Sequence, residues 1–421
     1  MALQCVTFAY LPGRTTAVPA GLLTMYEYGS PVQASQFGYG SRYLERVDAI
    51  AVDPVSLPLG EARPGSVRLY EPVNGLPLFG AVRDAIPDQW GRRLIENLLR
   101  VPANSLSESD YLMRAGEQRF GALDFRDTAD AQARATPMPP VTELAYLLEA
   151  ADRVQRNERI PQALAPLFKA GTSLGGARPK AVVERAGRLF IAKFPAAKDP
   201  FNVPLIECAT LELARECGLR VPELDLIDLP DGRQVMLIER FDRAPAKSGE
   251  QLRHHAVSAL TILGRHEQES SQASYSEIAR AISTYGATQI AEDLQELFAR
   301  MVFNILVSND DDHLRNHAFV FDAKASGWKL SPLFDVLPRP QVAQERFLGL
   351  GVGANGRLAT LANARSHAGQ FGLLAVDADA IIDHLVRCVR SWRVSFERLG
   401  VSKTECDSVA AAFRHPKEIG A

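Results

Sequence analysis

Cysteine is scarce in this chain, which has five in 421 residues: Cys5, Cys208, Cys217, Cys388 and Cys406. They are scattered and form no CxxC pair. This usage does not fit a disulfide framework and predicts reduced, mostly buried thiols. We therefore expect a cytoplasmic protein.

Long apolar runs and an excess of positive charge are also absent. No run approaches the roughly 18 apolar residues of a membrane span, so we expect no contact with a membrane. The opening residues lack the basic region and apolar run of a signal peptide. With 47 Lys and Arg against 50 Asp and Glu, the net charge is −3. This argues against a chain that holds nucleic acid by itself, but not against contact through a partner.

The chain has the composition and length of a globular protein with two or three domains, since 46% of its 421 residues are hydrophobic. Alternating runs predict strands near residues 5–10, 22–28 and 67–70. Apolar periodicity predicts a helix over 82–99, interrupted at residues 87–93. Residues 126–140, rich in Ala, Pro and Thr, are expected to be a linker. The predicted organisation is an α+β subdomain (1–125), this linker, a small β-rich lobe (141–243) and a mainly helical lobe (244–421).

The small lobe has a distinctive order of elements. A Gly-rich turn is followed by two strands, the second carrying Lys193, then by a helix carrying Glu207 and by a strand pair ending at Glu239. This is the order of a protein kinase N-lobe. The preceding segments, 141–156 and 161–169, are predicted to be helices.

An acidic loop between two apolar runs is the centre of the predicted site. Asp311 stands five residues before Asn316, and Asp335 follows nineteen residues later in another apolar run. A protein kinase uses such a trio: the first Asp handles the acceptor hydroxyl, and the Asn and second Asp hold Mg²⁺ on ATP. A solvated acidic turn and a calcium loop are the alternatives. The EF-hand pattern of alternating oxygen ligands, a central Gly and a terminal Glu is not in place.

Three further groups fit the kinase interpretation, each with a simpler alternative. Gly175 and Gly176 could turn backbone N–H groups toward a phosphate, or form a plain turn. Lys193 could pair with Glu207 and the ATP phosphates, or reach solvent from its strand. Residues 239–243 could be the hinge that bonds adenine through its backbone, or a turn with a surface ion pair.

Together these segments make the chain recognisable. It resembles the HipA family of bacterial toxin kinases over nearly its whole length. The blocks that carry the resemblance are SLPL (56–59), PDQWGRR (87–93), SLGGARPK (173–180), IAKFP (191–195), LARECGLRVP (213–222), IERFDR (238–243), NDDDHLRNH (309–317) and LSPLFDVL (330–337).

The resemblance implies a two-lobed, kinase-like α+β fold with an extra N-terminal subdomain, and a serine/threonine kinase that uses ATP and Mg²⁺. It makes Asp311 the catalytic base, with Asn316 and Asp335 as metal ligands. The spacing to Asn316 favours Asp311 as the base, although Asp310 or Asp312 could be mistaken for it. The nucleotide site would comprise Ser173, Leu174, Gly175, Gly176, Ala177, Lys193, Glu207, Glu239, Arg240, Phe241 and His313.

The resemblance also implies partners and control. Family toxins phosphorylate aminoacyl-tRNA synthetases, which halts translation and leads to persistence. A helix-turn-helix antitoxin of the HipB kind neutralises them and binds operator DNA. Autophosphorylation is expected at Ser173, with Thr172 as the alternative. Two rival functions are a non-catalytic co-repressor subunit bound to the antitoxin and a small-molecule phosphotransferase.

Overall fold

The computed structural model describes residues 2–61, 68–133, 138–161, 171–172, 175–415, 417 and 419. Contacts divide the chain into two compact units, residues 1–197 with 228–265 and residues 198–227 with 266–421. Each unit is therefore built from two separate stretches of chain. The domain boundaries expected at residues 125, 140 and 243 stay predictions. The helix expected over 161–169 lies outside the described residues, apart from Pro161.

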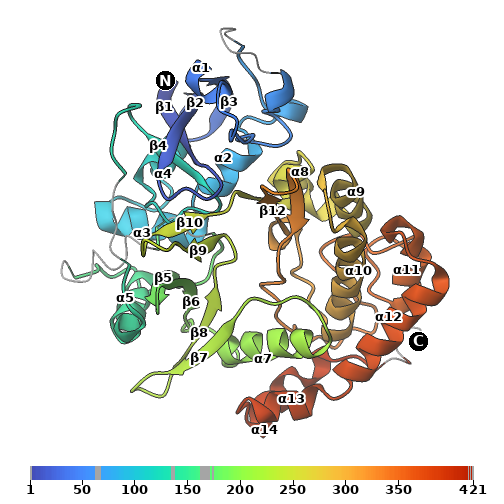
Figure 1. Cartoon of the computed structure of the whole chain (residues 1–421). Helices are drawn as coiled ribbons and strands as arrows, with labels where there is room; N and C mark the ends of the chain where they lie inside the picture. Colours follow the sequence, from blue (N-terminus) through green and yellow to red (C-terminus); the bar gives the residue numbers. More distant parts are fainter. Residues whose placement is uncertain are drawn as a thin grey trace. The chain divides into compact units, whose positions relative to one another are not determined.

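The first unit opens with a four-stranded antiparallel sheet of order β3-β2-β1-β4 (Figure 1). Its strands are β1 (Ala2–Tyr10), β2 (Ala17–Glu27), β3 (Val32–Tyr39) and β4 (Leu123–Arg126). Along β2, Leu23 and Met25 are buried while Leu22 and Tyr26 are exposed, the period of two that gives a sheet one apolar face. The strand expected over 67–70 is wrong for its described part. Tyr70 makes only an isolated bridge to Phe37, and β3 is the third strand instead.

The helices of this region are α1 (Ser41–Leu44), α2 (Gly80–Ala85), α3 (Gln89–Leu99) and α4 (Glu108–Arg114). The helix expected over 82–99, with an interruption at 87–93, is thus two helices separated by residues 86–88. Ile86 has an extended backbone, with φ −80° and ψ 138°. The cause is Pro87, because proline disfavours the helical conformation of the residue before it.

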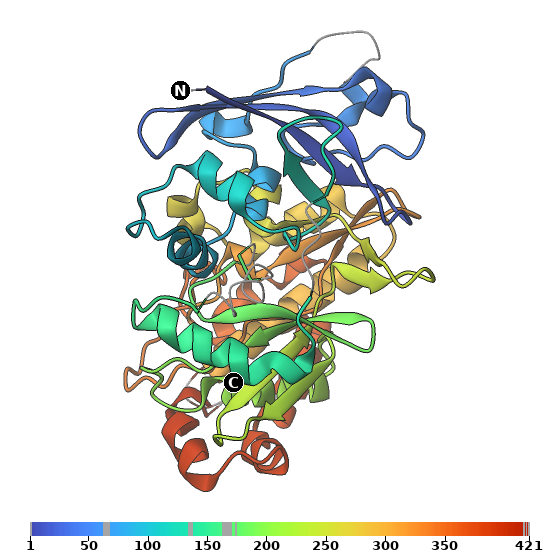
Figure 2. The same ribbon diagram turned by 90° about the vertical axis from the view of Figure 1, so that its left-hand side faces the viewer.

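A second antiparallel sheet of the first unit contains β5 (Lys180–Arg185), β6 (Arg188–Lys193) and β8 (Gln234–Glu239), in the order β5-β6-β8. Ala186 and Gly187, with φ values of 51° and 77°, form the tight turn between β5 and β6. Helix α5 (Leu144–Gln155) lies beside these two strands in both views (Figures 1 and 2). The unit is completed by β9 (Arg243–Pro245), β10 (Gln251–Arg253), β11 (Ala256–Ser258) and α8 (Ala259–Ile262).

The second unit is mainly helical. Its helices are α7 (Val203–Glu216), α9 (Tyr275–Tyr285), α10 (Ile290–Val307), α11 (Leu361–Ser366), α12 (Ala375–Val389), α13 (Trp392–Arg398) and α14 (Lys403–Val409). A hairpin of β12 (Ala318–Asp322) and β13 (Gly327–Leu330) follows α10, and β7 (Leu224–Asp228) spans the boundary between the units along the chain. Leu297, Phe298 and Met301 of α10 are fully buried, so this helix forms the core of the unit. Within the described part of the chain, no helix is long and apolar enough to cross a membrane.

Candidate active site

Helix α10 delivers the chain into the acidic loop. The helix ends at Val307, and the next residue, Ser308, adopts the left-handed conformation with φ 52° and ψ 45°. The Ser308 hydroxyl donates to the backbone oxygen of Ala412 at 2.7 Å. Asn309 is buried and donates its side-chain amide to Asn304 Oδ1 at 3.1 Å. The start of the loop is thus fixed to the core of the second unit.

The three consecutive aspartates have different environments. The Asp311 side chain is 61% exposed and that of Asp310 is 27% exposed, whereas Asp312 is buried. Burial raises the pKa of Asp310, and Asp311 adds to this effect while Arg339 opposes it. Of the three carboxylates, Asp311 is therefore the one that a substrate hydroxyl could reach most easily.

Asp312 is a structural carboxylate. Its Oδ2 accepts hydrogen bonds from the Tyr275 hydroxyl and from His317 Nε2, the latter at 2.9 Å. Burial alone would raise the pKa of Asp312, but the interactions with His317 and Tyr275 hold it below its ordinary value. Asp312 is therefore a charged, buried side chain whose hydrogen bonds are made within the protein.

Asn316 lies on the same turn as Asp311. It ends a short 3₁₀ helix (Leu314–Asn316), and its Nδ2 donates to the backbone oxygen of Asp311 at 3.2 Å. This bond leaves the amide oxygen of Asn316 as the group that could face a metal ion. Two of the predicted site residues are thus held together locally.

Asp335 has an unusual backbone. Its φ of 61° lies in the left-handed region, which costs a non-glycine residue on the order of 1 kcal/mol. Residues in sparsely populated conformations cluster at functional sites. The Asp335 side chain is exposed, as expected for a group that meets a ligand.

The oxygen donors of Asn316 and Asp335 suit Mg²⁺, which prefers hard oxygen ligands. Among the described residues, no group of three or more His, Cys, Asp or Glu side chains could hold a metal ion by itself. A magnesium ion here would need phosphate oxygens and water to complete its coordination, as in nucleotide sites. By their chemistry, the two side chains would therefore suit Mg²⁺ bound together with a nucleotide.

Arg339 is a site residue that the sequence did not reveal. Its Nη2 lies 2.6 Å from Asp311 Oδ2, and its Nε lies 3.4 Å from Asp310 Oδ1. The only signal was a basic residue four positions after Asp335. Because both partners are partly exposed, the ion pair contributes little to stability. It occupies one oxygen of the candidate base.

The predicted phosphate-binding lysine is buried at the end of β6. Lys193 pairs in register with Lys180 on one side and with Met236 on the other. Glu207 is buried on α7. Lys193 belongs to the first unit and Glu207 to the second, so their pairing stays a prediction.

The phosphate loop is described in part, because Ser173 and Leu174 lie outside the described residues. Gly176, with φ 83°, donates its N–H to Asp88 Oδ2 at 2.9 Å and accepts from the Trp90 N–H at 3.1 Å. Asp88 precedes the first residue of α3 but makes no capping bond to that helix. Residues at the start of α3 thus bind Gly176 through two hydrogen bonds, a contact that the sequence did not indicate.

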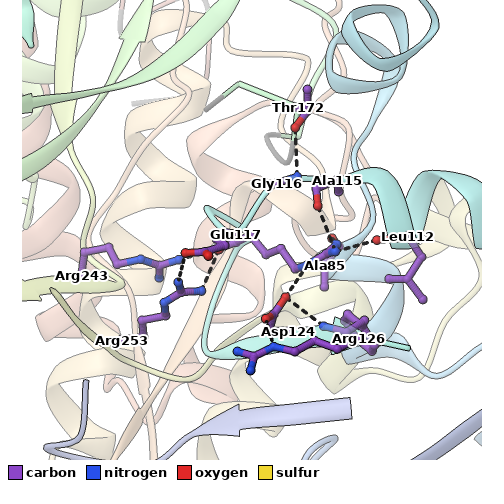
Figure 3. A network of polar contacts seen from close by, with 12 residues as sticks. Ala85, Leu112, Ala115, Gly116, Glu117, Asp124, Arg126, Thr172, Arg243 and Arg253 are labelled. Atoms are coloured by element: carbon purple, nitrogen blue, oxygen red, sulfur yellow. Dashed lines mark hydrogen bonds and ion pairs between the residues drawn. The ribbon is translucent and has the colours of Figure 1, made fainter. Parts of the chain in front are cut away.

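Thr172 is not presented for modification in this structure. Its side chain is buried, and its Oγ1 accepts from the Gly116 N–H at 2.9 Å (Figure 3).

The predicted hinge is anchored by buried ion pairs. Arg240 donates to the backbone oxygens of Gln118 and Arg119, both at 2.9 Å, and pairs with Asp242. Burial alone would raise the pKa of Asp242, but the guanidinium groups of Arg240 and Arg243 hold it well below its usual range. The alternative interpretation, a turn with a surface ion pair, therefore does not account for these buried interactions. Glu239 does form a more exposed pair with Arg188, but Arg240, Asp242 and Arg243 after it are buried.

The same buried network continues into the N-terminal region. Arg243 donates to the Gly121 backbone oxygen at 2.9 Å, and the Asp242 carboxylate accepts from the Gly121 N–H at 2.8 Å. Figure 3 shows Asp124 beside Arg126, and Arg253 beside Glu117. The segment that precedes β4 and the predicted hinge are therefore joined by one buried polar network within the first unit.

The fold is a mixed α+β fold of the kinase-like class, as the sequence predicted. It is similar to the HipA chain solved in complex with HipB and operator DNA from Shewanella oneidensis MR-1, with a TM-score of 0.67. That match covers 99% of this chain and 95% of that one at 16% identity, and so bears on the fold alone.

The family follows from the sequence comparisons. The HipA-like C-terminal domain model matches residues 172–392, more than half of the chain. The putative kinase Y4dM of Sinorhizobium fredii is 29% identical over 190 residues, covering 42% of this chain and 44% of that protein. Its relative Y4mE is 26% identical over 323 residues, covering 72% and 71%. A putative kinase of Haemophilus influenzae is 31% identical over 155 residues, covering 34% and 44%. The chain belongs to the HipA-like family, which confirms the resemblance, although its matches to two of these relatives span less than half of their length.

Proposed function

We propose that this protein is an ATP-dependent serine/threonine kinase that acts as the toxin of a toxin–antitoxin module. The observation that carries the proposal is the arrangement of the loop after α10. Asn316 donates to the backbone oxygen of Asp311, whose carboxylate is exposed, and Asp335, with its left-handed backbone, follows in the same unit.

The proposed roles follow from the chemistry of each group. Asp311 accepts the proton of the acceptor hydroxyl, and Asn316 and Asp335 hold the Mg²⁺ that accompanies ATP. Lys193, oriented by Glu207, binds the phosphates together with residues 173–177. Residues 239–241 bond the adenine through their backbone, and His313 completes the nucleotide site. When bound, Mg-ATP supplies the phosphoryl group that is transferred.

The proposed acceptor is a protein hydroxyl, in the first place one on an aminoacyl-tRNA synthetase in the cytoplasm, so that phosphorylation inhibits translation. We also propose Ser173 as the autophosphorylation site. The buried, hydrogen-bonded hydroxyl of Thr172 counts against that alternative. A phosphate on Ser173 would add about −1.5 to −2 charges where the ATP phosphates bind and so lower ATP affinity.

The proposed partner is a HipB-like helix-turn-helix antitoxin, through which the chain would reach operator DNA. The solved complex of Shewanella HipA with HipB and its operator supports this assignment by analogy of fold.

The test is phosphoryl transfer by purified protein in Mg-ATP, measured as ADP release and as phosphate on Ser173 by mass spectrometry. Asp311→Asn removes the carboxylate but keeps the metal ligands. It should bind Mg-ATP and transfer roughly 10²- to 10⁴-fold more slowly, without modified Ser173. Asp335→Asn should also weaken Mg-ATP binding. Asp322→Asn is the matched control, because Asp322 pairs with Lys329 on the β12–β13 hairpin, and it should behave as wild type.

The outcomes separate the proposal from its rivals. Wild-type rates for Asp311→Asn would show that the base is assigned wrongly. Mg-ATP binding without turnover would favour the non-catalytic co-repressor. Turnover that modifies no protein, neither this one nor those of a bacterial lysate, would favour a small-molecule phosphotransferase.

A further inference from the structure

The residues that flank the two loop groups are bonded to each other. Asp312 directly follows Asp311, and His317 directly follows Asn316. His317 Nε2 lies 2.9 Å from Asp312 Oδ2, and both residues are buried. This interaction joins the two ends of the segment 312–317, so that Asn316 lies within the closed turn and Asp311 directly precedes it.

Two helices hold this closure in place. Tyr275, the first residue of α9, donates its hydroxyl to Asp312 Oδ2 and accepts from Asn304 Nδ2 of α10 at 3.0 Å. The Tyr275 and His317 rings meet edge to face, with centroids 5.6 Å apart. The polar groups therefore sit in a packed environment that allows them few alternative positions.

A third segment presses on the loop backbone. A Cβ on Gly349 would come within 2.0 Å of the Asp312 backbone oxygen and 3.3 Å of that of Asp310. The loop is thus enclosed by α9, α10 and residue 349, while Asp311 alone of its three aspartates turns strongly toward solvent. Asp312 points into the protein and the adjacent Asp311 points toward solvent. The direction of the Asp311 side chain therefore depends on how Asp312 is held.

We propose that the Asp312–His317 pair, anchored by Tyr275, is a clip that positions Asp311 and Asn316 for phosphoryl transfer. The proposal rests on the proposed kinase function and assigns the pair a positioning role, without contact with the substrate. A buried carboxylate is costly unless its partners are well placed. In this loop the partners also determine where the next residue points.

The physical consequence concerns geometry more than charge. Misplacing a reacting group by about 1 Å can cost on the order of 10²-fold in rate. Loss of a group that orients a metal ligand typically costs 10- to 100-fold in metal affinity. Breaking the clip should therefore lower kcat and raise the Mg²⁺ concentration needed for half-maximal rate.

The test compares His317→Leu with His317→Gln. Leucine removes the donor, whereas the glutamine amide can place an N–H where Nε2 stood. His317→Leu should lower kcat on the order of 10²-fold and raise the Mg²⁺ midpoint about tenfold, and His317→Gln should recover most of both. Asp312→Ala should resemble His317→Leu. Rates are measured well below the melting temperature of the least stable variant, per mole of folded protein.

The control is Ser395→Ala, which removes a 2.6 Å hydrogen bond to Glu216 elsewhere in the same unit. It should lower the melting temperature while leaving kcat and the Mg²⁺ midpoint unchanged. If Asp312→Ala does not fold, the two His317 variants still decide the question.

Two kinds of failure are distinguishable. If the wild-type protein turns over no ATP, the proposed kinase function itself fails. If wild type is active and folded His317→Leu keeps its kcat and Mg²⁺ midpoint, the clip is wrong and the kinase proposal stands.

Discussion

At the residue scale, His255 gives the first unit a defined response to pH. It is buried, with Nε2 3.1 Å from the backbone oxygen of Val52. Burial lowers its pKa to about 4, although its backbone contacts oppose this shift. In the unfolded chain a histidine has a pKa of about 6.5, so below that pH the unfolded state binds a proton that the folded state does not. The free energy of unfolding should therefore fall as pH falls, by roughly 2 kcal/mol between pH 7 and pH 5.

This response can be measured by urea unfolding of wild type and His255→Gln at the two pH values. Glutamine can still donate to Val52 but does not titrate. The variant should lose less stability than wild type on acidification, with the difference near the expected 2 kcal/mol. Equal losses in both proteins would show that His255 is not responsible.

The sequence could predict a site residue when its interaction partners lay only a few positions away along the chain. Asp311 and Asn316 are five positions apart on one turn, so their spacing was visible. Asp312 could not be separated from its neighbours by sequence, because its burial depends on Tyr275, 37 positions away. Asp88 and Gly176 are 88 positions apart in the sequence, and no local sequence pattern predicts their hydrogen bond.

At the element scale, the same distinction holds for secondary structure. The capping box of Ser274 and Glu277 opens α9, and such a pattern can be recognised in a sequence because both partners lie in one turn. The interruption expected at Pro87 in the helix over 82–99 is equally local, because proline restricts the backbone of Ile86 directly before it. Strand β3 was not predicted because its Gln and Ser residues obscure the alternation of apolar and polar side chains. The strand forms through its pairing with β2.

The segment around Gly349 gives an element-scale prediction. Because a Cβ there would meet the Asp312 backbone oxygen at 2.0 Å, Gly349→Ala must displace either its own segment or the acidic loop. We expect about 1–3 kcal/mol of destabilisation and a loss of phosphoryl transfer. Thermal unfolding and the kinase assay measure the two effects.

The matched control is Gly369→Ala, since a Cβ at Gly369 meets no heavy atom within 4 Å. That variant should be as active as wild type and equally or slightly more stable. If Gly349→Ala behaves like Gly369→Ala, the loop is not confined by this segment.

At the scale of the whole molecule, the charge balance limits how the protein can meet DNA. With 47 basic and 50 acidic residues, the chain has a net charge of −3. Binding to duplex DNA depends on neutralising several phosphates with Lys and Arg, which makes it strongly dependent on salt. A chain with this balance has no overall attraction to DNA, so a basic helix-turn-helix partner would have to supply it.

This argument predicts the result of a gel-shift titration with the DNA upstream of the protein's own reading frame. The purified chain alone should give no salt-sensitive, sequence-specific shift at micromolar concentration. A helix-turn-helix protein encoded beside it should shift the DNA, and adding the chain should retard that complex further. An unrelated duplex of equal length is the control for non-specific binding. Tight, salt-dependent and specific binding by the lone chain would contradict the prediction, because it would require a local basic face strong enough to outweigh the net charge.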